Sequence, residues 1–154
     1  MRKAAVNLEA LPELATRWCQ GLGLNVTAKF EPSGDEELFP NRLVLAGPDA
    51  QWLMPNKGQA LDALQFLLHE AEGAREDGKL AYLDVQTFRL FRMIELKAMA
   101  AMAAKKAREL GSFSLSSLSP RERRWIHLVL GREPDLATAS EGDGHFKTLK
   151  VTRT

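Results

Sequence analysis

This sequence has one cysteine, few aromatic residues and no long hydrophobic segment. The single cysteine, Cys19, excludes an internal disulfide and any zinc site built from several cysteines, and it suits a reducing compartment. No stretch approaches about 18 consecutive apolar residues, so no membrane-spanning helix is expected. At the N-terminus, Asn7, Glu9 and Glu13 interrupt any signal-peptide core. We therefore predict a cytoplasmic protein that does not insert into a membrane.

The charge of the chain is nearly balanced but unevenly distributed. The 154 residues contain 21 Lys/Arg and 20 Asp/Glu, for a net charge of +1. Residues 1–86 hold 8 Lys/Arg against 13 Asp/Glu, whereas residues 87–154 hold 13 against 7. This asymmetry favours a C-terminal half that faces a polyanion, although a chance division of solvated surface charge is the alternative explanation.

The first half of the chain alternates helical and strand patterns. Apolar residues at spacings of three and four predict a helix at 11–22, and strict alternation predicts a strand at 24–31. A returning strand is predicted at 42–46, a stronger helix at 59–72 and a third strand at 80–85. A short helix is expected between the returning strand and the stronger helix. The predicted order is therefore α-β-β-α-α-β.

The second half begins with a long predicted helix at 87–110 whose expected apolar side comprises Phe88, Phe91, Ile94, Ala98 and Met102. A strand is predicted at 113–118, and two more at 136–140 and 146–152. Between them, Ser119-Pro120-Arg121-Glu122 is a capping box that predicts a helix at 120–130, with Gly131 as its C-terminal stop. The fold class is α+β, in two small domains at 1–86 and 87–154.

The helix at 120–130 contains the most distinctive polar group. Arg123, Arg124 and His127 fall within a sector of roughly 100° on its surface, and Arg123 and His127 are one turn apart. Two guanidinium groups, an imidazole and a helix N-terminus suit binding of phosphate or a base. Alternatively, Arg123 and His127 pack on the neighbouring sheet and pair with loop carboxylates such as those of Glu141 or Asp143.

These residues also resemble a known family. The segment Glu122-Arg123-Arg124-Trp125-Ile126-His127-Leu128, followed by Thr138-Ala139-Ser140-Glu141-Gly142, resembles the Arg-x-x-x-His (R-3-H) domain of the bacterial Jag proteins, and Gly58 to Leu67 resembles the start of the main helix of their preceding KH domain. The resemblance covers about residues 12–154. It implies a KH-like domain followed by an R-3-H module of helices on a small antiparallel sheet. It further implies binding of single-stranded nucleic acid, mainly RNA, linked to cell elongation and division, with Arg123 and His127 as the signature pair.

The KH loop departs from the family pattern. KH domains bind the nucleic-acid backbone through a Gly-x-x-Gly loop, whereas this chain has Pro55-Asn56-Lys57-Gly58. Proline removes a backbone donor, so this position cannot bind phosphate through its amide. Either the loop still binds weakly through Lys57 and the following helix N-terminus, or the degenerate domain remains as a fold and an interaction surface, which we favour. We expect no counterpart of the Jag N-terminal domain and linker.

The sequence therefore predicts a single-stranded RNA- or DNA-binding protein acting through its C-terminal module. Arg123 and His127 are the expected contacts, and the other candidate binding residues are Arg124, Lys105, Lys106, Arg108, Lys57 and Gly58. Neither catalysis, a cofactor nor a metal is expected, because the three histidines have no ligand spacing. Trp52 and Trp125 are expected to pack in the core or at an interface rather than stack on bases. The alternative is a protein–protein adaptor in which the KH-like half dimerises or docks on a partner and nucleic-acid binding is minor.

Overall fold

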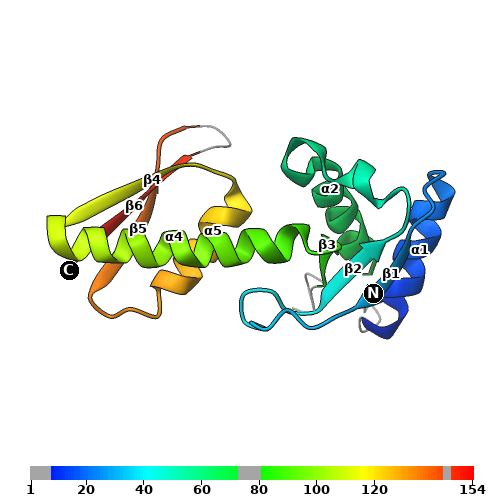
Figure 1. Cartoon of the computed structure of the whole chain (residues 1–154), viewed down its shortest axis with the longest axis horizontal. Helices are drawn as coiled ribbons and strands as arrows, with labels where there is room; N and C mark the ends of the chain where they lie inside the picture. Colours follow the sequence, from blue (N-terminus) through cyan, green and yellow to red (C-terminus); the bar gives the residue numbers. More distant parts are fainter. Residues whose placement is uncertain (1–7, 73–80, 144–146) are drawn as a thin grey trace, which may run out of the picture. The chain divides into compact units, whose positions relative to one another are not determined.

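The computed structural model describes residues 8–72, 81–143 and 147–154. The chain divides into two compact units, Met1–Leu90 and Phe91–Thr154, and each contains helices and a small three-stranded sheet. The α+β class predicted from the sequence is therefore confirmed (Figure 1). Among the described residues, no helix is long and apolar enough to cross a membrane.

The N-terminal unit follows the predicted order of helices and strands. Its elements are η1 (Leu8–Ala10), α1 (Leu11–Gly21), β1 (Thr27–Phe30), β2 (Arg42–Ala46), η2 (Ala50–Leu53), α2 (Pro55–Glu72) and β3 (Tyr82–Val85). Strand β2 lies in the middle of the sheet, antiparallel to β1 and parallel to β3. Four consecutive residues of β2 are buried, and since side chains alternate between the two faces of a strand, both faces of this central strand are covered.

Helices pack on this sheet through one continuous hydrophobic core. Its buried members come from α1, all three strands, η2 and α2: Leu11, Ala15, Cys19, Val26, Leu43, Leu45, Ala50, Leu53, Leu61, Leu64, Leu68, Ala81, Leu83 and Val85. Cys19 is therefore a core residue, and burial raises the pKa of its thiol. Strand β1 is shorter than the predicted 24–31, although Val26 still enters the core.

The C-terminal unit contains most of α4 (Phe88–Leu110), then β4 (Ser112–Leu118), α5 (Pro120–Leu130), β5 (Leu136–Glu141) and β6 (Lys147–Arg153). Strand β6 lies between β4 and β5, and both pairings are antiparallel. Side chains alternate in burial along the strands, with Leu115, Leu149 and Val151 buried while Ser114 is exposed. One face of the sheet is therefore covered.

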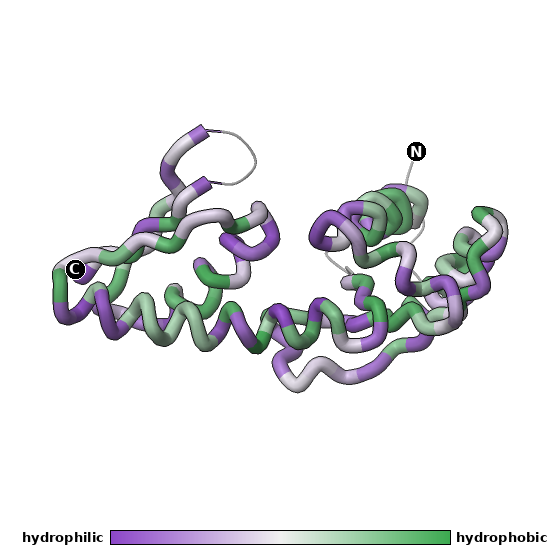
Figure 2. Tube along the Cα trace, turned by 45° about the horizontal axis from the view of Figure 1, so that its top comes forward, coloured by the Kyte–Doolittle hydropathy of each residue, from purple (hydrophilic) through white to green (hydrophobic). Residues whose placement is uncertain are grey.

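The predicted apolar side of α4 is wrong. Phe91, Ile94 and Met102 are exposed, and the buried side of the helix instead consists of Met93, Leu96, Ala100, Ala103, Ala104 and Ala107. Hydrophobic residues recur along the whole of α4 with hydrophilic ones between them (Figure 2), so periodicity alone does not single out one side. Four of these six buried residues are alanines, so small side chains make up most of the buried side.

Candidate nucleic-acid interface

Helix α5 starts at the capping box that the sequence predicts. The Ser119 hydroxyl accepts a hydrogen bond from the Glu122 amide at 3.3 Å, and the Glu122 carboxylate accepts one from the Ser119 amide at 3.0 Å. Glu122 is nearly buried, and its second oxygen accepts a 2.8 Å bond from Nε of Arg92 on α4. The same carboxylate therefore fixes the start of α5 and ties it to α4.

Arg123 points back into the protein rather than outward. Its side chain is 8% exposed, and Nη1 donates a 2.8 Å hydrogen bond to the carbonyl oxygen of Leu118 at the end of β4. That end of the strand is irregular, because the register with β6 shifts between Leu115 and Leu118 and Ser117 has a positive φ of 59°. Arg123 thus satisfies a buried carbonyl at an irregular strand end, which is a structural task.

His127 lies one turn further along α5 and faces strand β5. Its Nδ1 is 2.5 Å from the hydroxyl oxygen of Thr138, and its Nε2 is 3.2 Å from that of Ser140. Burial and, second, the charge of Arg123 lower the pKa of the imidazole from its ordinary value. The ring is therefore neutral at pH 7, with one nitrogen donating and the other accepting, and either hydroxyl can play the complementary role.

The signature pair is consequently set between α5 and the sheet. This arrangement corresponds to the alternative in which both residues pack on the neighbouring sheet, and the observed partners of His127 are hydroxyl groups rather than carboxylates. Thr138 and Ser140 as its partners could not be identified from spacing, since nothing in the sequence shows which face of β5 the helix covers.

Exposed positive charge adjoins this pair. Arg124 follows Arg123 and is solvent-exposed. Lys147 is paired with Leu118 across the β4–β6 ladder, so it lies beside the strand end that Arg123 binds, and it shares the helix-covered face with Leu149 by strand alternation. Arg123, His127 and Lys147 therefore lie at one end of the sheet, here called the α5 corner, and Arg124 adds an exposed positive charge on the same helix, which suits an anion.

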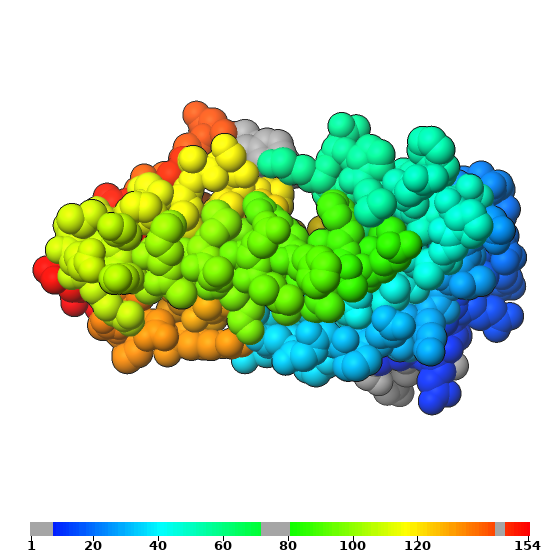
Figure 3. All heavy atoms as spheres, in the orientation of Figure 1, coloured from blue at the N-terminus to red at the C-terminus, as the bar shows by residue number. Residues whose placement is uncertain are grey.

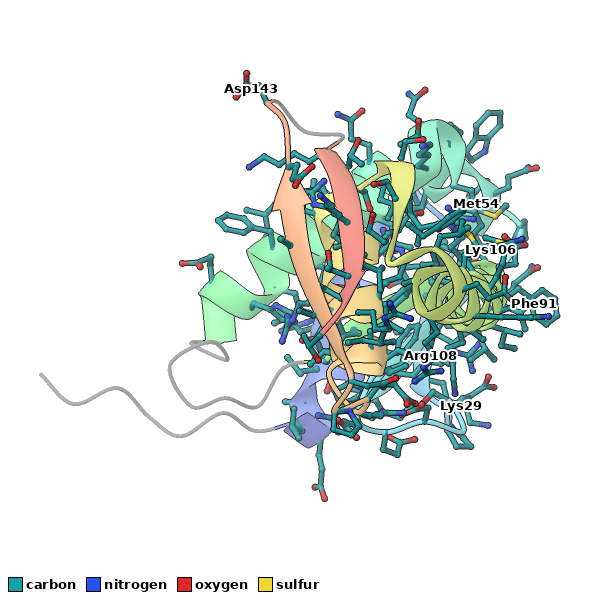
Figure 4. All side chains as sticks on the ribbon, turned by 90° about the vertical axis from the view of Figure 1, so that its left-hand side faces the viewer. Lys29, Met54, Phe91, Lys106, Arg108 and Asp143 are labelled. Carbon is teal, nitrogen blue, oxygen red and sulfur yellow. The ribbon has the colours of Figure 1, made fainter. Side chains whose placement is uncertain are left out.

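The other candidates on α4 lie elsewhere. Arg108 forms ion pairs with Asp135 at 2.7 Å and Glu133 at 2.9 Å, and the hydrogen bonds with these carboxylates raise its pKa, while Arg108 lowers the pKa of Asp135. Its charge is therefore matched within the chain. Lys105 and Lys106 are exposed. Lys106 projects from the side of α4 away from the sheet, and Arg108 from another side (Figure 4).

In the N-terminal unit, the Pro55–Gly58 segment forms a tight left-handed turn. Asn56, Lys57 and Gly58 all have positive φ, at 55°, 60° and 77°, so the helix expected at 59–72 is joined to a preceding turn across a kink. The Gly58 amide donates to the Met54 carbonyl at 2.9 Å. A Cβ atom on Gly58 would lie 2.9 Å from Nη2 of Arg89, so conformation and space both favour glycine here.

A group of charges, buried except for Asp62, holds this turn in place, and no local sequence pattern predicts it. Arg89 donates to the Gly58 carbonyl at 3.0 Å and to Asp62 at 2.5 Å. Asp84, fully buried, accepts from Nε of Arg42 at 3.0 Å and from the backbone amide of Arg89 at 2.6 Å. An aspartate within an otherwise apolar strand was the available signal, since a buried carboxylate needs partners.

The remaining candidates are the two tryptophans and the side chains that could bind a metal. Trp125 is 4% exposed and packs in the core, whereas Trp52 is 63% exposed and is therefore not a core residue, which leaves interface packing as the predicted alternative. Within the described residues there is no group of three or more His, Cys, Asp or Glu side chains that could hold a metal ion. His145 lies outside the described part of the chain.

Comparison with protein families identifies the C-terminal unit. Residues 94–153 match the family model of the R-3-H domain, which confirms the R-3-H part of the resemblance. R-3-H domains bind single-stranded nucleic acid, and the match therefore supports a nucleic-acid-binding role. Among the curated proteins compared, none matched the chain.

Proposed function

We propose that this protein binds single-stranded nucleic acid, with a preference for RNA over DNA, through its R-3-H unit. The observation that supports this most directly is the family match at 94–153, which contains the α5 corner with Arg123 and His127. The excess of Lys/Arg over Asp/Glu in residues 87–154 adds the non-specific attraction that a polyanion requires.

Within this site the residues have different tasks. Arg123 is a positioning residue, because its guanidinium binds the Leu118 carbonyl and is almost fully buried. Arg124 and Lys147 are the phosphate contacts, because Arg124 is exposed and Lys147 is half-exposed, so both charges can reach a ligand. The imidazole of His127, whose two nitrogens are bound to hydroxyl groups of β5, offers its ring face to a base or sugar.

The N-terminal unit is, in this proposal, a degenerate KH-like domain over about residues 1–86, followed by the R-3-H domain from 87. Its left-handed Pro55–Gly58 turn has the position of a Gly-x-x-Gly loop, with Gly58 and Lys57 retained. The unit as a whole has an acidic excess, with 13 Asp/Glu against 8 Lys/Arg in residues 1–86. We therefore assign this unit an interaction role, with nucleic-acid binding secondary.

The proposed cellular role is the one that the resemblance to the Jag proteins implies. We propose a bacterial, cytoplasmic protein of the Jag type that acts by binding rather than by catalysis, in control of cell elongation or division. No cofactor is part of this proposal.

The test is fluorescence anisotropy of the full chain with labelled single-stranded RNA and DNA of matched sequence, at about 50 and 200 mM salt. The key variant is Arg124→Ala/Lys147→Ala, because neither residue is buried and the fold is left intact. Lys29→Ala, an exposed lysine of the N-terminal unit, is the matched control. Circular dichroism checks that all three proteins fold.

Salt-sensitive binding that the double variant loses by about tenfold, and that Lys29→Ala retains, supports the assignment. The expected salt slope falls by about 0.7 for each phosphate contact removed. A double variant that binds as tightly as the native chain contradicts this site. Equal affinity for RNA and DNA contradicts the RNA preference alone.

A further inference from the structure

The outer side of α4 presents a continuous apolar stripe to solvent. Phe91, Ile94 and Met102 are 59%, 53% and 44% exposed, Ala98 and Ala101 between them are also exposed, and helical spacing places the exposed, charged Lys105 in the same sector. No other segment of the C-terminal unit covers this side of the helix in the space-filling view (Figure 3). Large apolar side chains gathered on one side of a helix are typical of an interaction surface rather than of solvated surface.

The charges beside this stripe have a defined polarity. Glu95 and Lys106 are eleven residues apart, which is about three helical turns, so both lie on the same flank of the stripe. Glu95 stands near its N-terminal end and Lys106 near its C-terminal end, and both are exposed. Phe91 and Lys106 both project away from the sheet (Figure 4).

We infer that this side of α4 pairs with the same side of α4 from a second copy of the chain, in antiparallel orientation. A two-fold axis near the midpoint of Glu95 and Lys106 places Glu95 of each copy opposite Lys106 of the other. In a parallel pair the same flank of the two copies would lie on opposite edges of the interface, so neither charge would face its opposite. Ala98 and Ala101 lie close to this midpoint, where small side chains let two helices approach.

The size of the stripe sets the strength of the pairing. From Phe91 to Lys106 the helix is about 24 Å long. A pair of single helices of this length buries an area at or below the lower end of stable interfaces, so the dimer is weak and concentration-dependent. Glu95 is already 3.0 Å from Arg92 in its own chain, but this pair is exposed and does not prevent a second partner.

Sedimentation velocity of the full chain over a series of micromolar concentrations tests the pairing. The native chain shifts from monomer to dimer, whereas Met102→Glu stays monomeric, because the new charge would be buried at the centre of the interface. Leu22→Glu is the matched control: Leu22 is a 71% exposed leucine in the N-terminal unit, and its variant dimerises like the native chain. A native chain that is monomeric throughout overturns the inference, as does a dimer indifferent to Met102→Glu.

Charge exchange and cross-linking test the orientation. Lys106→Glu raises the dissociation constant about tenfold, because two attractive pairs become repulsive, and the exchanged variant Glu95→Lys/Lys106→Glu restores it. Oxidised Glu95→Cys/Lys106→Cys forms a disulfide-linked dimer, since positions eleven residues apart on one helix cannot bridge within a chain. A dimer that fails both tests overturns the antiparallel arrangement.

Discussion

His127 lies one helical turn beyond Arg123 on α5, and burial together with the Arg123 charge holds its pKa below the ordinary value. The unfolded chain therefore binds a proton more readily than the folded one just below about pH 6.5. It follows that the contribution of His127 to stability is complete above that pH and is lost as the pH falls. An NMR titration of the His127 ring should give a midpoint below the ordinary value.

The corresponding stability measurement compares the native chain with His127→Gln. Urea unfolding from about pH 7.5 to about pH 5.5 should lose more stability in the native chain than in the variant, because glutamine does not titrate. Carboxylates titrate in both proteins and cancel in the difference. Equal slopes, or a His127 midpoint above the ordinary value, would contradict the arrangement of this pair.

Substitutions of two consecutive arginines should have opposite consequences. Arg123→Ala leaves the buried Leu118 carbonyl without its donor and should lower the free energy of unfolding by about 1–3 kcal/mol. Arg124→Ala removes an exposed side chain and should change stability by no more than about 0.5 kcal/mol, while weakening nucleic-acid binding. Urea unfolding and anisotropy on both variants separate the two effects. Equal stabilities would show that the Arg123 bond is not structural.

Gly58→Ala should destabilise the N-terminal unit more than a glycine replacement in open space. Gly58 (φ 77°) is crowded by Arg89 and Phe88, whereas a Cβ atom added to Gly34 (φ 84°) would have no atom within 4 Å. Gly34→Ala costs the left-handed conformation alone, about 1 kcal/mol. Gly58→Ala adds a clash with a pinned guanidinium, at least about 1 kcal/mol more. Thermal unfolding of the two variants measures the difference, and equal losses would mean that Arg89 moves aside freely.

Local signals in the sequence predicted helices and strands well where chemistry marks their ends. The capping box and Gly131 fix α5 at Pro120–Leu130, and the apolar run after Arg42 gives β2 at its observed bounds. Helix α4 shows the opposite case. It has apolar residues on every side, and the larger ones, such as Phe91, are predicted to be buried, whereas the buried side consists mainly of alanines.

The site was predictable in part for the same reason. Arg123 and His127 were identified from spacing on one helix, because helical geometry fixes which residues share a side. Their partners Thr138 and Ser140, and the Arg89–Asp84–Arg42 group that supports the Gly58 turn, are brought together only by long-range packing. No local pattern encodes such contacts, although a charged residue in a buried strand indicates that a partner exists.

The capping box of α5 provides a final test, because one of its two members has a second partner. Ser119→Ala removes a single cap bond and should cost about 1 kcal/mol, whereas Ser114→Ala, an exposed serine of β4, should be neutral. Glu122→Ala should cost more than Ser119→Ala, since it breaks the reciprocal cap bond and also the ion pair with Arg92. Urea unfolding ranks the three variants. If Ser119→Ala and Glu122→Ala are equal, the Arg92 pair contributes nothing, and the link between α4 and α5 must come from apolar packing alone.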